Sequence, residues 1–103
     1  MNAVILRPET DLGITTYWLV VDGDNVGTIH PLGRHAPKFA ADYWVWRIEF
    51  PVMDMPDWCK GHASSLEKAQ VDAERAYARI RGSLTKAEYD NALWKKDGKV
   101  RGL

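Results

Sequence analysis

The fold of this 103-residue chain is decided by one stretch, Tyr43-Trp44-Val45-Trp46-Arg47-Ile48-Glu49-Phe50. Successive side chains of a β-strand point to opposite faces of its sheet, and apolar residues recur here at every second position. The stretch therefore predicts a strand that buries Trp44, Trp46, Ile48 and Phe50 and exposes Arg47. Exposed indole rings beside a buried Arg47 would contradict this prediction.

Two further strands are predicted N-terminal to it, at 17–21 and 26–30, because both segments are rich in β-branched and aromatic residues. The four residues between them, Asp22-Gly23-Asp24-Asn25, are of the types that form tight hairpin turns. The sequence leaves open which two of these four residues form the loop.

Two registers follow from this choice. A Gly23-Asp24 loop pairs Trp18 with Ile29, and an Asp24-Asn25 loop pairs Val20 with Ile29. The two registers differ by two residues, so both place Trp18, Val20 and Ile29 on one face, which we expect to be the core face.

The other face of this hairpin is expected to carry five residues, Tyr17, Leu19, Val21, Val26 and Thr28. That set is too apolar for an ordinary solvent face. We therefore expect it to be covered by the N-terminal segment, by a C-terminal helix or by a second molecule.

The segments around these strands are less regular. Residues 1–13 contain one short apolar run, Val4-Ile5-Leu6, which forms either an edge strand or an unpaired arm; we favour the strand. Residues 31–42 form a loop of about a dozen residues that carries Arg34 and Lys38, and loops of this length in small domains are often functional.

Two helices are expected near the C-terminus. Ser64-Ser65-Leu66-Glu67 predicts a capping box that starts a helix over about 65–81, with Gly82 as its C-terminal cap. Thr85-Lys86-Ala87-Glu88 predicts a second box and a shorter helix through about Lys96. The last residues, 97–103, are predicted to be a flexible basic tail.

Together these elements predict a single α+β domain over residues 1–96. It consists of a three-stranded antiparallel meander, with or without an N-terminal strand, packed against one long helix and a short one. The 14 basic and 14 acidic residues cancel, so no whole-molecule field attracts nucleic acid or anionic lipid. The single cysteine indicates a reducing compartment, and no segment has the length of a signal peptide or membrane span. We therefore expect a soluble cytoplasmic protein.

Three spaced patterns resemble a recurrent set of short uncharacterised bacterial proteins over about residues 15–80. They are Val21-Asp22-Gly23-x-x-Val26-Gly27-x-Ile29, Trp44-x-Trp46 and Gly61-x-Ala63-x-Ser65-x-x-x-Ala69. This resemblance implies the fold and no activity. Phe50-Pro51, ahead of an Ala-rich helix, is also loosely similar to HicB-like antitoxins, which implies shared β-β-β-α architecture but not descent.

Candidate chemistry is sparse. Cys59-x-x-His62 has the spacing of half a zinc site, but no second such pair exists in the sequence. Catalysis by the Cys59 thiolate needs an electropositive setting, whereas Asp54 and Asp57 make the neighbourhood acidic. The two glycines of the hairpin, Gly23 and Gly27, are not followed by a helix, as a dinucleotide-binding loop requires. We expect no enzyme activity, no cofactor and no metal.

The leading functional hypothesis is a non-catalytic protein-binding or self-associating module. The alternative is a nucleic-acid-associated accessory protein that uses the free sheet face, the 31–42 loop and the basic tail. The candidate partner-binding residues are Tyr17, Leu19, Val21, Arg34, Lys38 and Arg47.

Overall fold

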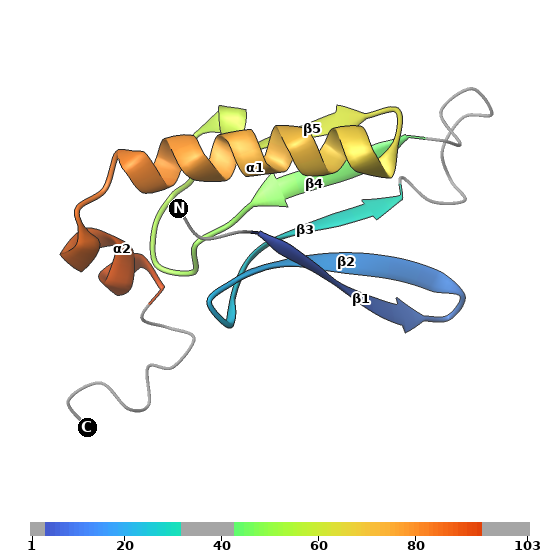
Figure 1. Ribbon diagram of the computed structural model, residues 1–103, viewed down its shortest axis with the longest axis horizontal. Helices are drawn as coiled ribbons and strands as arrows, with labels where there is room; N and C mark the ends of the chain where they lie inside the picture. Colours follow the sequence, from blue (N-terminus) through green and yellow to red (C-terminus); the bar gives the residue numbers. More distant parts are fainter. Residues whose placement is uncertain (1–3, 32–42, 94–103) are drawn as a thin grey trace.

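The computed structural model describes residues 4–31 and 43–93, which form one antiparallel sheet and two α-helices (Figure 1). The sheet has five strands in the order β1-β2-β3-β4-β5. Their bounds are β1 Ile5–Asp11, β2 Ile14–Val21, β3 Asp24–Pro31, β4 Trp44–Ile48 and β5 Lys60–Ala63. The predicted α+β class is confirmed, but the predicted count of three strands is too low.

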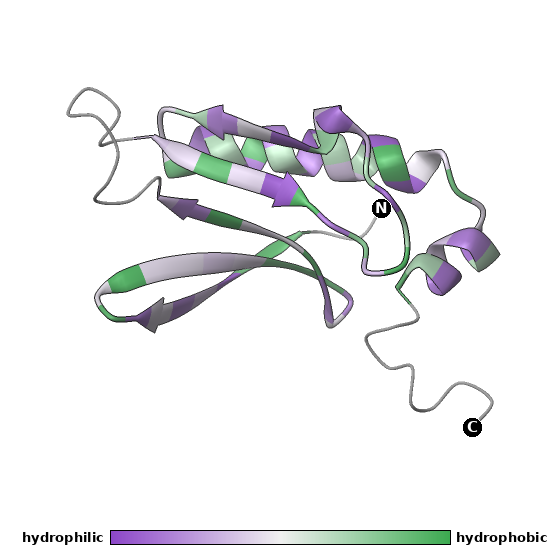
Figure 2. Ribbon diagram, turned by 180° about the vertical axis from the view of Figure 1, so that it is seen from behind, coloured by the Kyte–Doolittle hydropathy of each residue, from purple (hydrophilic) through white to green (hydrophobic). Residues whose placement is uncertain are grey.

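One helix covers one face of this sheet. Helix α1, Leu66–Gly82, packs chiefly against β4 and β5, while the β1–β2 hairpin extends away from it (Figure 1). The short helix α2, Lys86–Ala92, follows at the end of the molecule where α1 terminates. We call the sheet face that lies opposite α1 the open face; Figure 2 shows the molecule from that side.

The alternation predicted for β4 is confirmed. Trp46 is 7% exposed and Ile48 is 2% exposed, whereas Arg47 between them is exposed. Phe50, just past the strand, is 1% exposed and makes an edge-on contact with the Tyr77 ring of α1. Trp46 and Phe50 thus anchor the core beneath α1, as the sequence predicts, whereas Trp44 is only partly buried.

The predicted facing of the β2–β3 hairpin is wrong, as are both predicted registers. Asp22 and Gly23 form the turn, with φ values of 52° and 84°, and Val21 pairs with Asp24. Val20 then pairs with Asn25 but Leu19 pairs with Gly27.

Val26 is thus one extra residue on β3, a β-bulge, and its carbonyl accepts a hydrogen bond from the Glu49 amide. Beyond the bulge Tyr17 pairs with Ile29, so Tyr17, Leu19 and Val21 share the α1 side with Ile29. Trp18 and Val20 lie on the open face.

Two strands flank the predicted meander. The favoured N-terminal strand is confirmed as β1, which pairs with β2 through a tight turn at Leu12 and Gly13. The edge strand β5 was not predicted, because its four residues, Lys60–Ala63, are too few to show an alternation in sequence.

The helix caps differ in part from the predictions. Ser65, not Ser64, caps α1, and its side chain accepts the Lys68 amide. Gly82 is the last helical residue instead of the cap, which is Ser83. The capping box of α2 between Thr85 and Glu88 is confirmed. Helix α2 ends at Ala92 with Leu93 as its C-cap, so the predicted end near Lys96 is too late. The predicted loop and the tail fall within 32–42 and 94–103, outside the described residues.

Candidate functional site: the open face of the sheet

A row of polar and aromatic side chains crosses the open face from one sheet edge to the other. The register pairs Arg7 with Trp18, Trp18 with Thr28, Thr28 with Arg47, and Arg47 with Lys60. Side chains that pair directly across antiparallel strands point to the same face. All five strands therefore contribute one residue each to this row, which we call the cross-strand row: Arg7, Trp18, Thr28, Arg47 and Lys60.

Three of the five residues of this row are cations, and all three are exposed. The Arg47 guanidinium lies 3.9 Å from the Glu49 carboxylate, and both of these side chains are more than half exposed, so the ion pair is weak. Arg7 donates a long hydrogen bond of 3.4 Å to the Asn25 side chain. Within residues 4–31 and 43–93, Arg7 and Lys60 form no ion pair. The cations thus remain available to an anionic partner.

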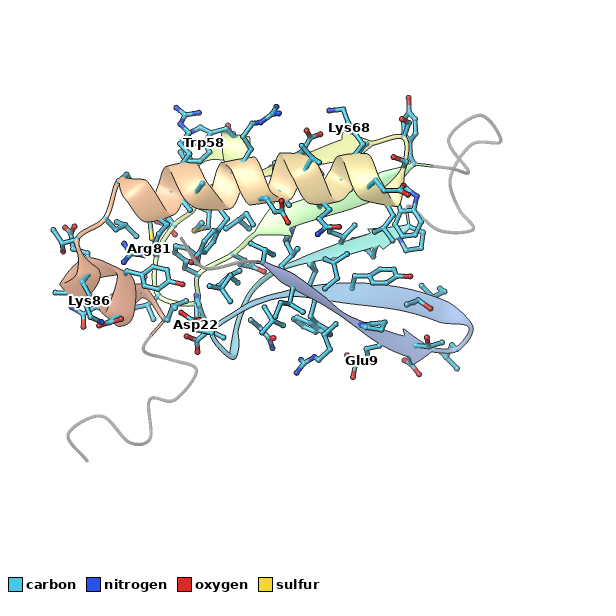
Figure 3. All side chains as sticks on the ribbon, in the orientation of Figure 1. Glu9, Asp22, Trp58, Lys68, Arg81 and Lys86 are labelled. Carbon is cyan, nitrogen blue, oxygen red and sulfur yellow. The ribbon has the colours of Figure 1, made fainter. Side chains whose placement is uncertain are left out.

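Trp18 is held in place by a hydrogen bond. Its indole Nε1 donates to the Glu9 carboxylate at 2.7 Å, and the side chain is half-buried. Glu9 belongs to β1, at the opposite border of the molecule from Trp58 and Lys68 (Figure 3). One carboxylate next to the row is therefore bound to the indole, and the ring stays partly accessible.

Beside the row lies a hollow of about 640 Å³. The sheet side of the hollow includes four residues of the row, Trp18, Thr28, Arg47 and Lys60, together with Asn25 and Glu49. The other side is the segment between β4 and β5, which contributes Met53 and Met55 among others. The volume of the hollow is in the range of ligand pockets. The hollow places cations, amide and carboxylate groups around apolar thioether side chains.

The thiol that lines the hollow is poorly suited to nucleophilic attack. Cys59 lines the hollow but is only 1% exposed, and burial raises the pKa of its thiol, although the nearby Arg79 partly opposes this. Such a thiol is protonated near neutral pH and is a poor nucleophile. Among the described residues no three His, Cys, Asp or Glu side chains gather as metal ligands. His62 contacts the Tyr43 ring instead, with centroids 6.4 Å apart.

The candidate residues from the sequence fall in three places. Leu19 and Val21 are at most 1% exposed and lie in the core, so they present no surface to a partner. Tyr17 is half-buried on the same side, with its ring 6.1 Å from that of Trp44. Arg47 lies on the open face as expected, and Arg34 and Lys38 lie outside the described residues.

Sequence reasoning missed Arg7, Trp18 and Lys60. Arg7 and Lys60 belong to the two edge strands, and Trp18 was placed on the wrong face because the bulge at Val26 was not recognised. The sequence contained a signal for the bulge. Val26 is apolar and Gly27 is small, so both suit the interior of the protein, whereas strict alternation places only one of two adjacent residues there.

A second, smaller hollow of about 250 Å³ lies on the α1 side, among Trp46, Trp58, Arg75 and Arg79. The Arg79 guanidinium stacks over the Trp58 ring, 3.9 Å from its centroid. The indole Nε1 of Trp46 is buried and forms no hydrogen bond within the described parts of the chain. The stacked Arg79 and Trp58 side chains form part of the wall of this hollow.

None of the helices in the described ranges combines the length and the apolar character needed to span a bilayer. The comparisons with known proteins add no further information on the site: no protein-family model, no curated protein and no solved structure matches this chain. Any functional assignment therefore depends on the open face itself.

Proposed function

We propose that this protein is a non-catalytic binding module that holds a nucleic-acid strand against the open face of its sheet. The observation that supports this proposal is the cross-strand row, in which three cations and one indole ring are aligned over five strands. Neighbouring strands are about 4.8 Å apart, so the row extends over roughly 19 Å. Cations aligned with a stacking ring are the elements with which proteins bind nucleic-acid backbones and bases.

The face of the sheet on which each β2 side chain lies changes the relative support for the two functional hypotheses drawn from the sequence. Protein binding was favoured because Tyr17, Leu19 and Val21 were expected on an uncovered apolar face. Leu19 and Val21 instead lie in the core, so that argument no longer applies. Arg47 keeps its expected position and gains Lys60 as its direct neighbour, which supports the nucleic-acid alternative.

The zero net charge does not oppose this proposal. No carboxylate belongs to the row itself; beside it, Glu9 accepts the indole hydrogen bond of Trp18, Glu49 lies 3.9 Å from Arg47, and Asp54 and Asp57 line the hollow. Phosphate contacts depend on the local cations within about one Debye length, roughly 8–10 Å at physiological salt, more than on the total charge.

Salt-dependent binding of a labelled oligonucleotide tests the proposal. Three phosphate contacts predict a slope of log K against log salt of about −2, or roughly a twenty-fold loss of affinity between 50 and 200 mM. Arg47→Gln and Lys60→Gln should each reduce the magnitude of this slope by about 0.7.

The controls for this experiment lie on the helices. Arg75→Gln on α1 and Lys86→Gln on α2 make the same change of charge at exposed sites away from the row. Both should leave affinity and slope unchanged. Absence of binding at low salt, or equal losses in the control variants, would refute the proposal.

Self-association is a second candidate function, and exposed apolar residues of the β1–β2 hairpin support it. Ile5, Leu12 and Ile14 are 61%, 87% and 39% exposed. Against it, Pro8 lies in the middle of the edge strand β1 and cannot donate a hydrogen bond to a strand from another molecule. Sedimentation velocity over a hundred-fold concentration range decides between a monomer and an associating species.

A further inference from the structure

We infer that the nucleic acid bound by the open face is single-stranded, and that one unpaired base enters the hollow beside Trp18. This inference rests on the proposed function and specifies its ligand. It follows from three properties of the hollow: its volume, the chemistry of its lining, and the position of the cations at its wall.

The volume of the hollow is the first of these properties. A volume of about 640 Å³ matches pockets that take drug-sized ligands, and a nucleobase is smaller than such a ligand. In a duplex each base is paired and stacked, so it cannot enter a hollow unless it is first extruded from the helix. A single strand offers its bases without that cost.

The lining suits an uncharged aromatic ring with polar edges. The Trp18 ring and the thioether side chains of Met53 and Met55 provide apolar and polarisable contacts. Asn25 and Glu49, which contact Arg7 and Arg47 in the unbound protein, place an amide and a carboxylate in the lining, and such groups pair with the hydrogen-bonding edge of a base. Stacking on aromatic side chains and edge hydrogen bonds are the means by which single strands are recognised.

The charges are arranged for a chain in which anionic groups alternate with neutral ones. Arg47 and Lys60 pair directly across β4 and β5 at the wall of the hollow, where they can hold the phosphates on either side of the inserted base. The hollow itself is also lined by three carboxylates, Glu49, Asp54 and Asp57. These carboxylates oppose the entry of an acidic side chain into the hollow, whereas a neutral base can enter it while its flanking phosphates stay outside at Arg47 and Lys60. The pattern therefore favours a nucleic-acid strand over an acidic protein segment.

The test compares four probes by fluorescence anisotropy at one salt concentration. They are a labelled 12-nucleotide single strand of mixed sequence, the duplex of the same sequence, a strand of equal length made of abasic sites, and poly-L-glutamate as a competitor. The abasic strand keeps the phosphates and removes every base. We expect it and the duplex each to bind at least five-fold more weakly than the intact strand, since stacking of one base contributes a factor of this size or more.

Variants at Trp18 connect the effect to the hollow. Trp18→Leu should abolish the difference between the intact and abasic strands, whereas Trp18→Phe should retain most of it because a ring remains. The salt slope should stay the same in both variants, since Arg47 and Lys60 are intact. Far-UV circular dichroism confirms that each variant is folded.

The outcomes separate the two proposals. Binding of none of the nucleic acids removes the proposed function as well as this inference. Equal binding of duplex, abasic and intact strands, with a loss in Arg47→Gln, retains the proposed function and overturns the inserted base. Competition by poly-L-glutamate at charge concentrations equal to those of the intact strand would show that the row binds anions of any kind, and would overturn both.

Discussion

At the scale of single residues, Gly27 shows how closely two strands approach in this sheet. It pairs with Ile48, and a methyl group at Gly27 would collide with the backbone carbonyl of Arg47 and touch the Leu19 side chain. Backbone cannot move aside as a flexible side chain can. Gly27→Ala should therefore destabilise the protein by about 3 kcal/mol, measured by urea unfolding.

The chain offers a matched control for that substitution. Gly82 is exposed at the end of α1, has no atom near the position of an added methyl group and has no positive φ. Gly82→Ala should stabilise the protein by up to about 1 kcal/mol, because alanine favours the helix. If the two substitutions changed stability alike, the close approach at Gly27 would be refuted.

A second residue-scale prediction concerns Leu12, in the turn between β1 and β2. Its φ is 53° and its side chain is 87% exposed, so it has the strain of a left-handed conformation without the benefit of burial. Leu12→Asn should stabilise the protein by about 1 kcal/mol, because asparagine tolerates this conformation in two-residue hairpin turns.

Leu12→Val separates backbone strain from the removal of an exposed apolar side chain. Valine is β-branched and disfavours positive φ more strongly, so thermal unfolding should show no gain. Equal gains in the two variants would mean that strain at Leu12 is absent.

At the scale of elements, the periodicity of the apolar residues correctly predicted the features that depend on local sequence. The alternation in β4 was sufficient because one face is buried by aromatic residues, and α1 was predicted to within a residue of its bounds because its apolar stripe and caps are local. The facing of β2 depended on one inserted residue at Val26, and a bulge reverses every prediction of facing made across it.

The candidate site inherited these errors. Arg47 was found because it lies on the strand with the clearest alternation, whereas Trp18 was assigned to the core. The row itself could not be derived from the sequence, because it requires the registers of four strand pairs at once. Its members are 53 residues apart at most in sequence, from Arg7 to Lys60, and no local period relates them.

The start of α1 provides a prediction at this scale. Ser65 accepts the Lys68 amide at 3.1 Å, so Ser65→Ala should cost about 1 kcal/mol of stability. Ser64 is an exposed neighbour that does not cap the helix, and Ser64→Ala should change the unfolding midpoint little. A larger loss for Ser64→Ala would mean that the cap is at Ser64, as the sequence alone predicted.

At the scale of the whole molecule, the core is closed by a cluster of aromatic rings between the sheet, α1 and α2. Phe50 and Tyr77 make edge-on contacts with Tyr89, and the Tyr77 and Tyr89 hydroxyls are 2.9 Å apart. The Arg81 guanidinium lies over the Tyr89 ring, 4.3 Å from its centroid. This cluster connects the C-terminal helix to the rest of the fold, so its protonation state affects global stability.

The last prediction is a loss of stability at alkaline pH. Burial, and then the hydrogen bond with Tyr77, raise the pKa of Tyr89, with Asp24 adding to the rise and Arg81 opposing it. Burial likewise raises the pKa of Cys59. Both groups are neutral in the folded protein and ionise more readily when it unfolds, so their stabilising contribution is complete below the unfolded pKa values of about 8.5 for Cys and 10 for Tyr. As the pH rises past these values, the free energy of unfolding should decrease.

Urea unfolding at pH 7, 8.5, 10 and 11 measures this decrease, and two substitutions apportion it. Tyr89→Phe keeps the ring contacts with Phe50 and Tyr77 but has no ionisable group, so it should lose some stability at pH 7 and then decline less than the wild type above pH 10. Cys59→Ala should reduce the decline between pH 8.5 and 10, where the thiol ionises in the unfolded chain. If Tyr89→Phe declined as steeply as the wild type above pH 10, ionisation of Tyr89 would not limit stability there.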